Sequence, residues 1–307
     1  MYKSTFDRYR YLTCLAALVT YLMLSHAPVQ AQSVAIWPHM APGETSRDSG
    51  TTLPVRPDEK LAITRVEHIT FPTIDVYPAA QPNGTAILVL PGGGFRYVVP
   101  DLEGSEVAPA LNDLGVTVFV LRYRVTGDSS ENAWQKPVQD SQRAIRWIRA
   151  NASQFQLDPS RIGLLGFSAG GQVAAWQLSE EGKSAYQPQD RIDDQPLYPD
   201  FAIFVYPWKL LETASGSAAG ATRLRMTLLS TAPKSLLIGT SDDSGADPRG
   251  VARLYLDLID RSVDAELHIY RTGGHGYGVR KREGSLIHQW PTVMVDWLRE
   301  QNLITKP

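Results

Sequence analysis

The sequence predicts an α/β fold with a mainly parallel central sheet and helices on both faces. From Thr85 onward, short apolar segments typical of strands alternate with segments typical of helices, as in folds built from parallel strands. Hydrophobic residues make up 43% of the 307 residues, which is sufficient for the core of one large domain. The sequence shows no internal repeat.

The alternation places each element in order. We expect strands near residues 85–90, 116–123, 161–166, 201–206, 234–240 and 265–270, and helices near 103–114, 135–154, 169–180, 249–262 and 286–302. Residues 63–77 alternate enough to predict two earlier strands. Residues 180–199 and 209–233 interrupt the pattern with polar, proline and small residues. We expect both as loops above the strand ends, where α/β folds bind ligands.

The N-terminus has the pattern of a secretory signal peptide. Lys3, Arg8 and Arg10 precede an apolar run over 12–24. A cleavage site of the small-residue type follows and ends at Ala31. A run of this length is shorter than the roughly 20 residues that span a bilayer. We therefore expect a signal peptide over 1–31, an irregular arm over 32–60, and an α/β catalytic domain over 61–307. The mature protein would be periplasmic or secreted.

Composition excludes several classes of partner. The formal net charge of −2 gives no basic surface for nucleic acid and no polybasic patch for a membrane. The sole cysteine, Cys14, would leave with the signal peptide, so the mature chain has no thiolate nucleophile or zinc thiolate site. Glycine patterns for dinucleotides and for nucleoside phosphates both fail. We expect no cofactor and no metal.

The most informative motif is Gly166-Phe167-Ser168-Ala169-Gly170. It follows an apolar strand pattern over 161–165 and opens a helix-like run, which is the context of a nucleophile elbow. A serine becomes a good nucleophile when a tight turn holds it beside a general base and near oxyanion donors. The alternative is a glycine-rich loop in which Ser168 caps the following helix.

A second glycine cluster follows the apolar strand over 85–90, in the run Pro91-Gly92-Gly93-Gly94-Phe95. Consecutive glycines let the backbone approach a substrate closely. We expect N–H groups of Gly93 or Gly94, together with that of Ala169, to bind the oxyanion. A flexible turn is the alternative.

The candidate base is His275, which lies in Gly273-Gly274-His275-Gly276-Tyr277-Gly278 after the last predicted strand. The other histidines fit less well. His26 is in the signal peptide, His39 and His68 precede the core strands, His268 is on a strand, and His288 is on the final helix. The order Ser, Asp, His favours His275.

The candidate acid follows the strand over 234–240, where Asp242 and Asp243 are adjacent. A carboxylate here would accept the Nδ1 proton of the histidine and stabilise the imidazolium. The pattern leaves the two aspartates ambiguous. A solvated turn or a helix N-cap is the alternative for either one.

Together these motifs resemble the α/β-hydrolase family of bacterial carbohydrate esterases that includes acetylxylan and related hemicellulose esterases. The likeness extends to Ile36-Trp37-Pro38, Glu103-Gly104, Arg122-Tyr123-Arg124 and Gln139-Asp140, and covers nearly all of the mature chain. It implies the α/β-hydrolase fold and favours Asp243, the second acid of the pair. In similar sequences a Val-Pro segment commonly comes directly after the acidic residue of the triad. This chain has Ser244-Gly245-Ala246-Asp247-Pro248 instead, which leaves Asp247 as a remote alternative.

The resemblance implies a serine esterase that removes acyl groups, acetyl above all, from plant cell-wall polysaccharide such as xylan or its oligosaccharides. A feruloyl or general short-chain carboxylesterase would use the same triad. A serine peptidase or a non-catalytic binding module fits less well. Aromatic residues near the strand ends could stack on sugar rings or fill the core and rim: Phe95, Tyr97, Trp134, Trp208 and Tyr277.

Overall fold

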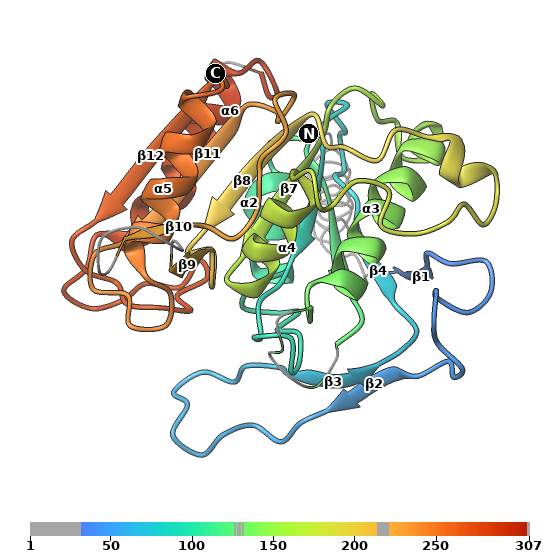
Figure 1. The fold of residues 1–307 in the computed structure, drawn as a ribbon, viewed down its shortest axis with the longest axis horizontal. Helices are drawn as coiled ribbons and strands as arrows, with labels where there is room; N and C mark the ends of the chain where they lie inside the picture. The colour runs from blue at the N-terminus through green and yellow to red at the C-terminus, as the bar shows by residue number, and fades with distance from the viewer. Residues whose placement is uncertain (1–31, 126, 128–129, 131, 214–220, 306–307) are drawn as a thin grey trace, which may run out of the picture. The chain divides into compact units, whose positions relative to one another are not determined.

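An eight-stranded sheet forms the centre of the protein (Figure 1). The computed structural model describes residues 32–125, 127, 130, 132–213 and 221–305, and the expected signal peptide lies outside this part of the chain. In spatial order the strands are β1 (Gln32–Ala35), β4 (Thr73–Tyr77), β6 (Thr117–Arg122), β5 (Ala86–Leu90), β7 (Ile162–Phe167), β8 (Phe201–Val205), β11 (Ser235–Thr240) and β12 (Ala265–Tyr270).

The six strands from β6 to β12 are parallel, and β4 and β1 join one edge in antiparallel pairing. The register pairs Leu90 at the end of β5 with Gly166 in β7, and Phe167 with Val205 in β8. The loops after these strands therefore all begin at the C-terminal end of the parallel sheet. The predicted α/β fold with a mainly parallel sheet is confirmed.

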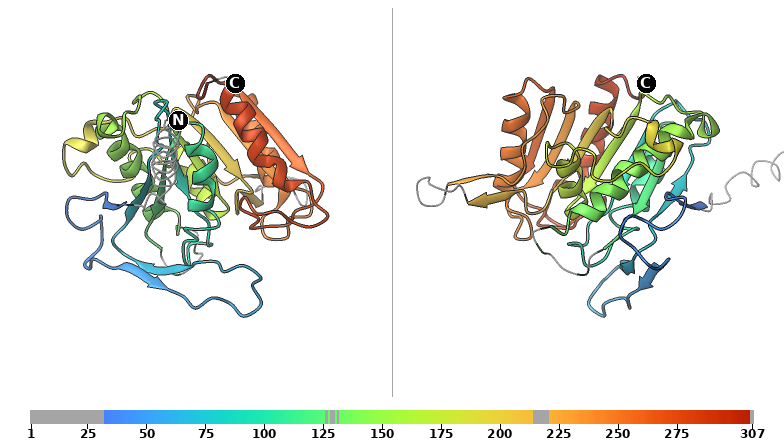
Figure 2. Two further views of the ribbon diagram at one scale, coloured as in Figure 1. Left: turned by 180° about the vertical axis from the view of Figure 1, so that it is seen from behind. Right: turned by 45° about the vertical axis from the view of Figure 1, so that its right-hand side comes forward.

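Helices cover both faces of the sheet (Figures 1 and 2). Along β5, Leu88 belongs to the apolar cluster that includes residues of α3, α4 and α5, whereas its neighbour Val89 belongs to the cluster that includes residues of α2 and α6, because successive side chains of a strand point to opposite faces. The helices are α2 (Ala108–Asn112), α3 (Gln135–Ala150), α4 (Ala169–Gln177), α5 (Pro248–Ile259) and α6 (Trp290–Glu300), with short 3₁₀ turns η1 (Ser105–Val107), η2 (Ala152–Phe155), η3 (Arg191–Asp194) and η4 (Ile287–Gln289).

Residues 32–60, expected as an irregular arm, contain two short strands. β1 pairs with β4 at the edge of the central sheet, and β2 (Ser49–Thr52) pairs with β3 (Val66–Ile69) in a separate ribbon. Both strands are largely exposed and lack an apolar alternation. Backbone pairing defines them, and pairing with distant strands leaves no local sequence signal.

Three of the motifs behind the resemblance meet at one buried carboxylate, that of Asp140 in α3. It accepts hydrogen bonds from the Nε1–H of Trp37 at 2.9 Å and from the backbone N–H and the Nε–H of Arg124, each at 2.9 Å. Both partners of the Arg124–Asp140 ion pair are about 1% exposed or less. These several donors compensate the buried charge of Asp140. The hydrogen bonds connect α3 to the N-terminal segment and to the residues that follow β6.

The two expected loops contact each other, and the N–H of Glu180 donates to the carbonyl of Thr227 at 2.8 Å. Residues 180–199 pack against α3, where Arg143 binds Asp190 and Arg146 binds Asp193. The expectation that this loop lies above the C-terminal ends of the strands is wrong. The loop connects the end of α4 to the start of β8, so it lies at the N-terminal ends of the strands. Within 209–233, β9 (Leu211–Thr213) pairs with β10 (Thr222–Leu224).

No helix in the described part of the chain has the length and apolarity to cross a bilayer.

Candidate active site

Ser168 stands at the sharp turn between β7 and α4, with φ of 50° and ψ of −116°. A non-glycine residue seldom adopts this conformation, and such strain concentrates at functional sites. The turn depends on its glycines. A Cβ atom on Gly170 would lie 1.9 Å from the carbonyl oxygen of Leu90, so only glycine lets α4 start this close to the end of β5.

The hydroxyl of Ser168 contacts the candidate base. Its Oγ lies 2.7 Å from Nε2 of His275, although 107 residues separate the two. Ser168 is the N-cap residue of α4, but its side chain makes no capping hydrogen bond. The helix-capping alternative therefore does not describe this serine.

His275 lies in the loop after β12, between glycines with positive φ: 63° at Gly274 and 64° at Gly276. The guanidinium of Arg282 donates to the carbonyl of His275 at 2.8 Å and to that of Gly276 at 3.0 Å, which fixes the loop backbone. Nδ1 of His275 lies 2.9 Å from Oδ2 of Asp243. With the Nδ1 proton facing this carboxylate, Nε2 accepts the hydroxyl proton of Ser168.

The structure separates the roles of the three aspartates. Asp243, with a side chain 3% exposed, contacts His275 through Oδ2 and accepts the N–H groups of Gly245 and Ala246 through Oδ1. Asp242 accepts the N–H groups of the histidine loop, at 3.2 Å from Gly273 and 2.8 Å from Gly274. These backbone hydrogen bonds lower the pKa of the Asp242 carboxyl.

Asp247, the remote alternative, is the N-cap of α5. Its side chain accepts the N–H of Arg249 at 3.0 Å and also pairs with the guanidinium of the same residue, which lowers the pKa of the Asp247 carboxyl. It faces its own helix. Of the three carboxylates, Asp243 is the one hydrogen-bonded to His275.

The glycine cluster after β5 lies beside the serine. Gly93 and Gly94 line the same cavity as Ser168, with φ of 131° and 64°. The N–H of Gly92 donates to Glu103 at 2.9 Å, whereas those of Gly93 and Gly94 donate to no described residue. Ala169 is the first residue of α4, where N–H groups lack helical partners. These free donors have the chemistry of an oxyanion site.

Sequence reasoning missed the role of Glu103, which it noted only as part of the resemblance. This glutamate is 4% exposed and lines the cavity. Besides the N–H of Gly92, it accepts the hydroxyl of Tyr206 at 2.9 Å. Burial raises the pKa of its carboxyl. The Tyr206 oxygen accepts in turn from the N–H of Gly278, and the tyrosine ring meets that of His275 edge-on at 4.9 Å.

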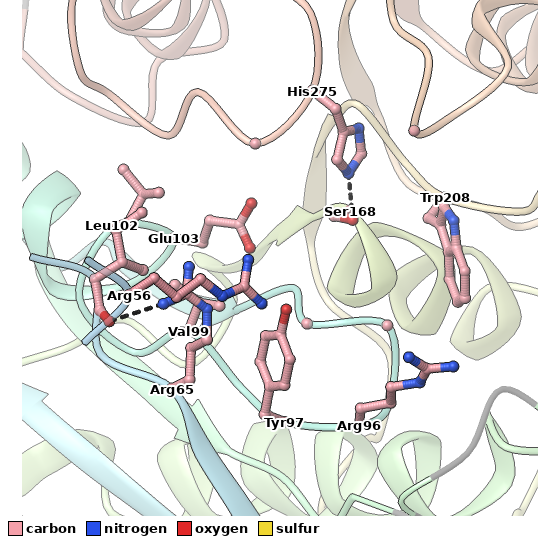
Figure 3. Close-up of a pocket in the computed structure, with 15 residues that line it drawn as sticks. Arg56, Arg65, Arg96, Tyr97, Val99, Leu102, Glu103, Ser168, Trp208 and His275 are labelled. Atoms are coloured by element: carbon pink, nitrogen blue, oxygen red, sulfur yellow. Dashed lines mark hydrogen bonds between the residues drawn. The ribbon is translucent and has the colours of Figure 1, made fainter. Parts of the chain in front are cut away.

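The cavity has a volume of about 600 Å³, within the range of small-molecule sites. Two of the five aromatic candidates line it, Tyr97 and Trp208 (Figure 3). Phe95 is buried edge-on to Trp208, with ring centroids 6.1 Å apart. The other two pack elsewhere, Trp134 stacked on Trp176 and Tyr277 against Tyr206.

One wall of the cavity comes from the N-terminal segment, which sequence reasoning did not connect with the site. Arg56, Ile63 and Arg65 line it together with Arg96 of the glycine loop. The segment is polar and follows no periodic pattern, so no local signal placed it there. Tertiary contacts hold it, including reciprocal backbone hydrogen bonds between Val66 and Val98 at 3.0 and 2.9 Å.

Comparisons with known proteins show which proteins the chain is similar to. The family model BD-FAE matches residues 74–195. The chain is 26% identical to an acetylxylan esterase of Xylanibacter ruminicola over 224 residues, which cover 64% of this chain and 42% of the relative. It is 34% identical to endo-1,4-beta-xylanase B of Butyrivibrio fibrisolvens over 127 residues, 39% of this chain and 19% of the relative. The chain thus spans less than half the length of either relative.

A solved structure has the same fold. The acetyl ester-xyloside bifunctional hydrolase of Caldicellulosiruptor lactoaceticus superimposes with a TM-score of 0.66 at 24% identity, covering 91% of this chain and all of that one. At this identity the likeness supports the fold alone. The site residues above are those of this chain, and their roles rest on its own geometry.

Proposed function

We propose that this chain, which has the fold of α/β-hydrolases and is similar to an acetylxylan esterase, is a serine esterase that removes acyl groups, acetyl above all, from xylan or its oligosaccharides. The observation that carries the proposal is the hydrogen-bonded series from Ser168 through His275 to Asp243, with distances of 2.7 and 2.9 Å. A nucleophile, a base and an orienting carboxylate in this order perform acyl transfer in unrelated folds.

In the first step, Oγ of Ser168 attacks the ester carbonyl while Nε2 of His275 takes the hydroxyl proton. Asp243 stabilises the imidazolium that forms. The carbonyl oxygen becomes an oxyanion bound by the N–H groups of Ala169 and of Gly93 or Gly94. The bond to the sugar oxygen then breaks, and His275 returns the proton to that oxygen, which leaves as the alcohol.

In the second step, water replaces the sugar. His275 takes a proton from the water, whose oxygen attacks the acyl-enzyme carbonyl. Collapse of this intermediate releases the carboxylic acid and restores the serine hydroxyl. Each proton transfer uses the same Nε2 atom, which the structure positions at hydrogen-bond distance from Oγ.

Two observations favour a carbohydrate as the alcohol part. Tyr97 and Trp208 present aromatic rings to the cavity, and such rings stack on the apolar faces of sugars. Two curated relatives are named for acetylxylan and for xylan. A feruloyl ester or a simple short-chain ester would need the same catalytic groups, so substrates must distinguish these activities.

The test is a side-by-side assay of purified protein on acetylated xylo-oligosaccharides, acetylated xylan, feruloylated arabinoxylan and p-nitrophenyl acetate. Of the four substrates, we expect the acetylated xylo-oligosaccharides to be hydrolysed with the highest kcat/KM. Ser168→Ala should lower turnover on every substrate by about 10⁶ and leave the thermal midpoint nearly unchanged. Equal activity of this variant and the wild type would remove Ser168 from its role, and a preference for feruloyl esters would replace the acetyl assignment.

A further inference from the structure

The cavity around Ser168 has a strongly basic wall. Arg56, Arg65 and Arg96 all line it (Figure 3). Among its described lining residues, Glu103 is the one carboxyl, and both of its oxygens already accept protein hydrogen bonds. The cavity therefore presents more positive than negative charge to a substrate, although the whole chain has a formal net charge of −2.

The three arginines are not equivalent. Arg65 is held by an ion pair with Glu59, its side chain is 8% exposed, and its guanidinium lies 5.8 Å from the ring centroid of Tyr97. Its buried Nε–H has no acceptor in the described part of the chain. Arg56 and Arg96 are exposed, and no hydrogen bond or ion pair joins either guanidinium to a described residue. Two guanidinium groups thus line the cavity without a hydrogen-bonded carboxylate in the described part of the chain. Glu59 is bound by Arg65, and Arg65 and, more weakly, Arg56 lower the pKa of its carboxyl.

The segment that carries Arg56 and Arg65 is anchored to the site. Arg280, which follows the histidine loop, donates to the carbonyl of Ala62 at 3.0 Å and pairs with Glu106 in η1. The N–H of Thr64 donates to Oδ2 of Asp101 at 2.6 Å. These contacts tie the segment to the loop after β5. The basic wall is therefore a built part of the pocket.

A neutral sugar offers only hydroxyl groups to such a wall. A guanidinium matches a carboxylate in shape and charge, binding it through two parallel N–H···O bonds. A concave site of one charge sign also raises the local concentration of substrates of the opposite sign. Both effects favour an anionic group near the ester that Ser168 attacks.

We propose that the preferred substrate is an acylated carbohydrate bearing a carboxylate, a uronic acid, which Arg56 and Arg96 bind while Ser168 attacks a neighbouring ester. This inference rests on the proposed esterase function. It adds a subsite for the acid. Tyr97, at one side beside Arg65, and Trp208, whose ring carries the Lys209 ammonium at 4.2 Å, flank this subsite with aromatic surface.

The kinetic test compares two acetylated xylo-oligosaccharides of equal length, one neutral and one with a glucuronic acid side group. The readout is the ratio of kcat/KM for the acidic substrate to that for the neutral one. We expect the wild type to prefer the acidic substrate. Arg56→Gln and Arg96→Gln should each lower the ratio about fivefold, the loss of one solvent-exposed ion pair. About 1 M NaCl should reduce the preference of the wild type.

The matched control is Arg253→Gln on α5, which removes one exposed arginine outside the cavity. This variant should keep the wild-type ratio. An unchanged ratio in the double variant Arg56→Gln/Arg96→Gln would overturn the proposal. A preference that followed a carboxylate on the acyl chain instead of on the sugar would also overturn it.

A binding measurement separates this inference from the esterase proposal. Ser168→Ala protein is titrated calorimetrically with unesterified xylo-oligosaccharides, with and without glucuronic acid. Tighter binding of the acidic oligosaccharide, lost in the background of Arg56→Gln/Arg96→Gln, supports the subsite even if no tested ester is hydrolysed. Equal binding of both oligosaccharides, with p-nitrophenyl acetate still cleaved by the wild type, would overturn the subsite and leave the esterase proposal intact.

Discussion

The hydroxyl of Tyr206 donates a 2.9 Å hydrogen bond to Oε1 of Glu103, and this bond joins the two loops on which the site depends. Through its other oxygen, Glu103 holds the N–H of Gly92 in the glycine loop. Tyr206 accepts the N–H of Gly278, three residues after His275. The glycine loop and the histidine loop are thereby positioned by one buried carboxyl, although 103 residues separate Tyr206 from Glu103.

Glu103→Gln should weaken this link. An amide has one acceptor oxygen where the carboxylate has two, so one of the two donors loses its partner. We expect turnover to fall about tenfold, the cost of one weakened hydrogen bond to a charged group, with little change in fold. Kinetics on p-nitrophenyl acetate and circular dichroism measure both. Unchanged turnover would show that the link does not position the site.

The same variant should change the pH dependence of stability. Because burial raises the folded pKa of Glu103 above its ordinary value, the folded state binds a proton that the unfolded state releases, and stability falls as pH rises through that window. Glutamine has no such loss. Chemical unfolding from about pH 4 to about pH 8 should show Glu103→Gln gaining stability relative to the wild type as pH rises. A difference between Glu103→Gln and the wild type that is constant with pH would contradict this.

The paired aspartates give a sharper contrast. Asp243→Asn removes the acceptor of the His275 Nδ1 proton and favours the wrong tautomer, so turnover should fall by about 10⁴. Asp242→Asn keeps one of the two oxygens that accept the N–H groups of the histidine loop, so it should cost about tenfold or less. Both variants are assayed on one activated acetate ester, with circular dichroism as the folding control. A larger loss for Asp242→Asn would transfer the acid role to Asp242.

Gly93→Ala tests the glycine loop. The added Cβ would lie 1.9 Å from the carbonyl oxygen of Tyr97, so the loop must shift and its N–H groups with it. Loss of an oxyanion donor lowers turnover by about 100-fold to 1000-fold. Gly43→Ala is the matched control, because Gly43 also has positive φ but open space around it. Equal turnover in both variants would remove Gly93 from the oxyanion site.

We also propose that the protein is exported and that its mature form begins near Gln32. N-terminal sequencing of the protein recovered from periplasmic and culture fractions of expressing bacteria measures this directly. Ala31→Glu should block cleavage, because the processing site requires a small residue. Recovery of the exported protein with Met1 intact would refute the signal peptide.

The sequence was sufficient to predict the sheet, its helices and the order of the site motifs. The reason is local: β5, β7 and β11 are apolar runs bounded by glycine or turn residues, and periodicity reports such elements. It was insufficient for β1 and β2, whose short, exposed strands depend on distant partners. It also misplaced residues 180–199, since polar composition does not tell at which end of a sheet a loop lies.

For the site, the sequence by itself determined which groups could be nucleophile, base and acid, because glycine turns after strands have local signatures. Only the tertiary structure decided which groups meet. In the tertiary structure Asp243 is hydrogen-bonded to His275, Asp242 to the backbone of the histidine loop, and Asp247 to the start of α5. Arg56 lines a cavity built from segments far apart in the chain. Such meetings depend on long-range packing, which no local pattern of residues encodes.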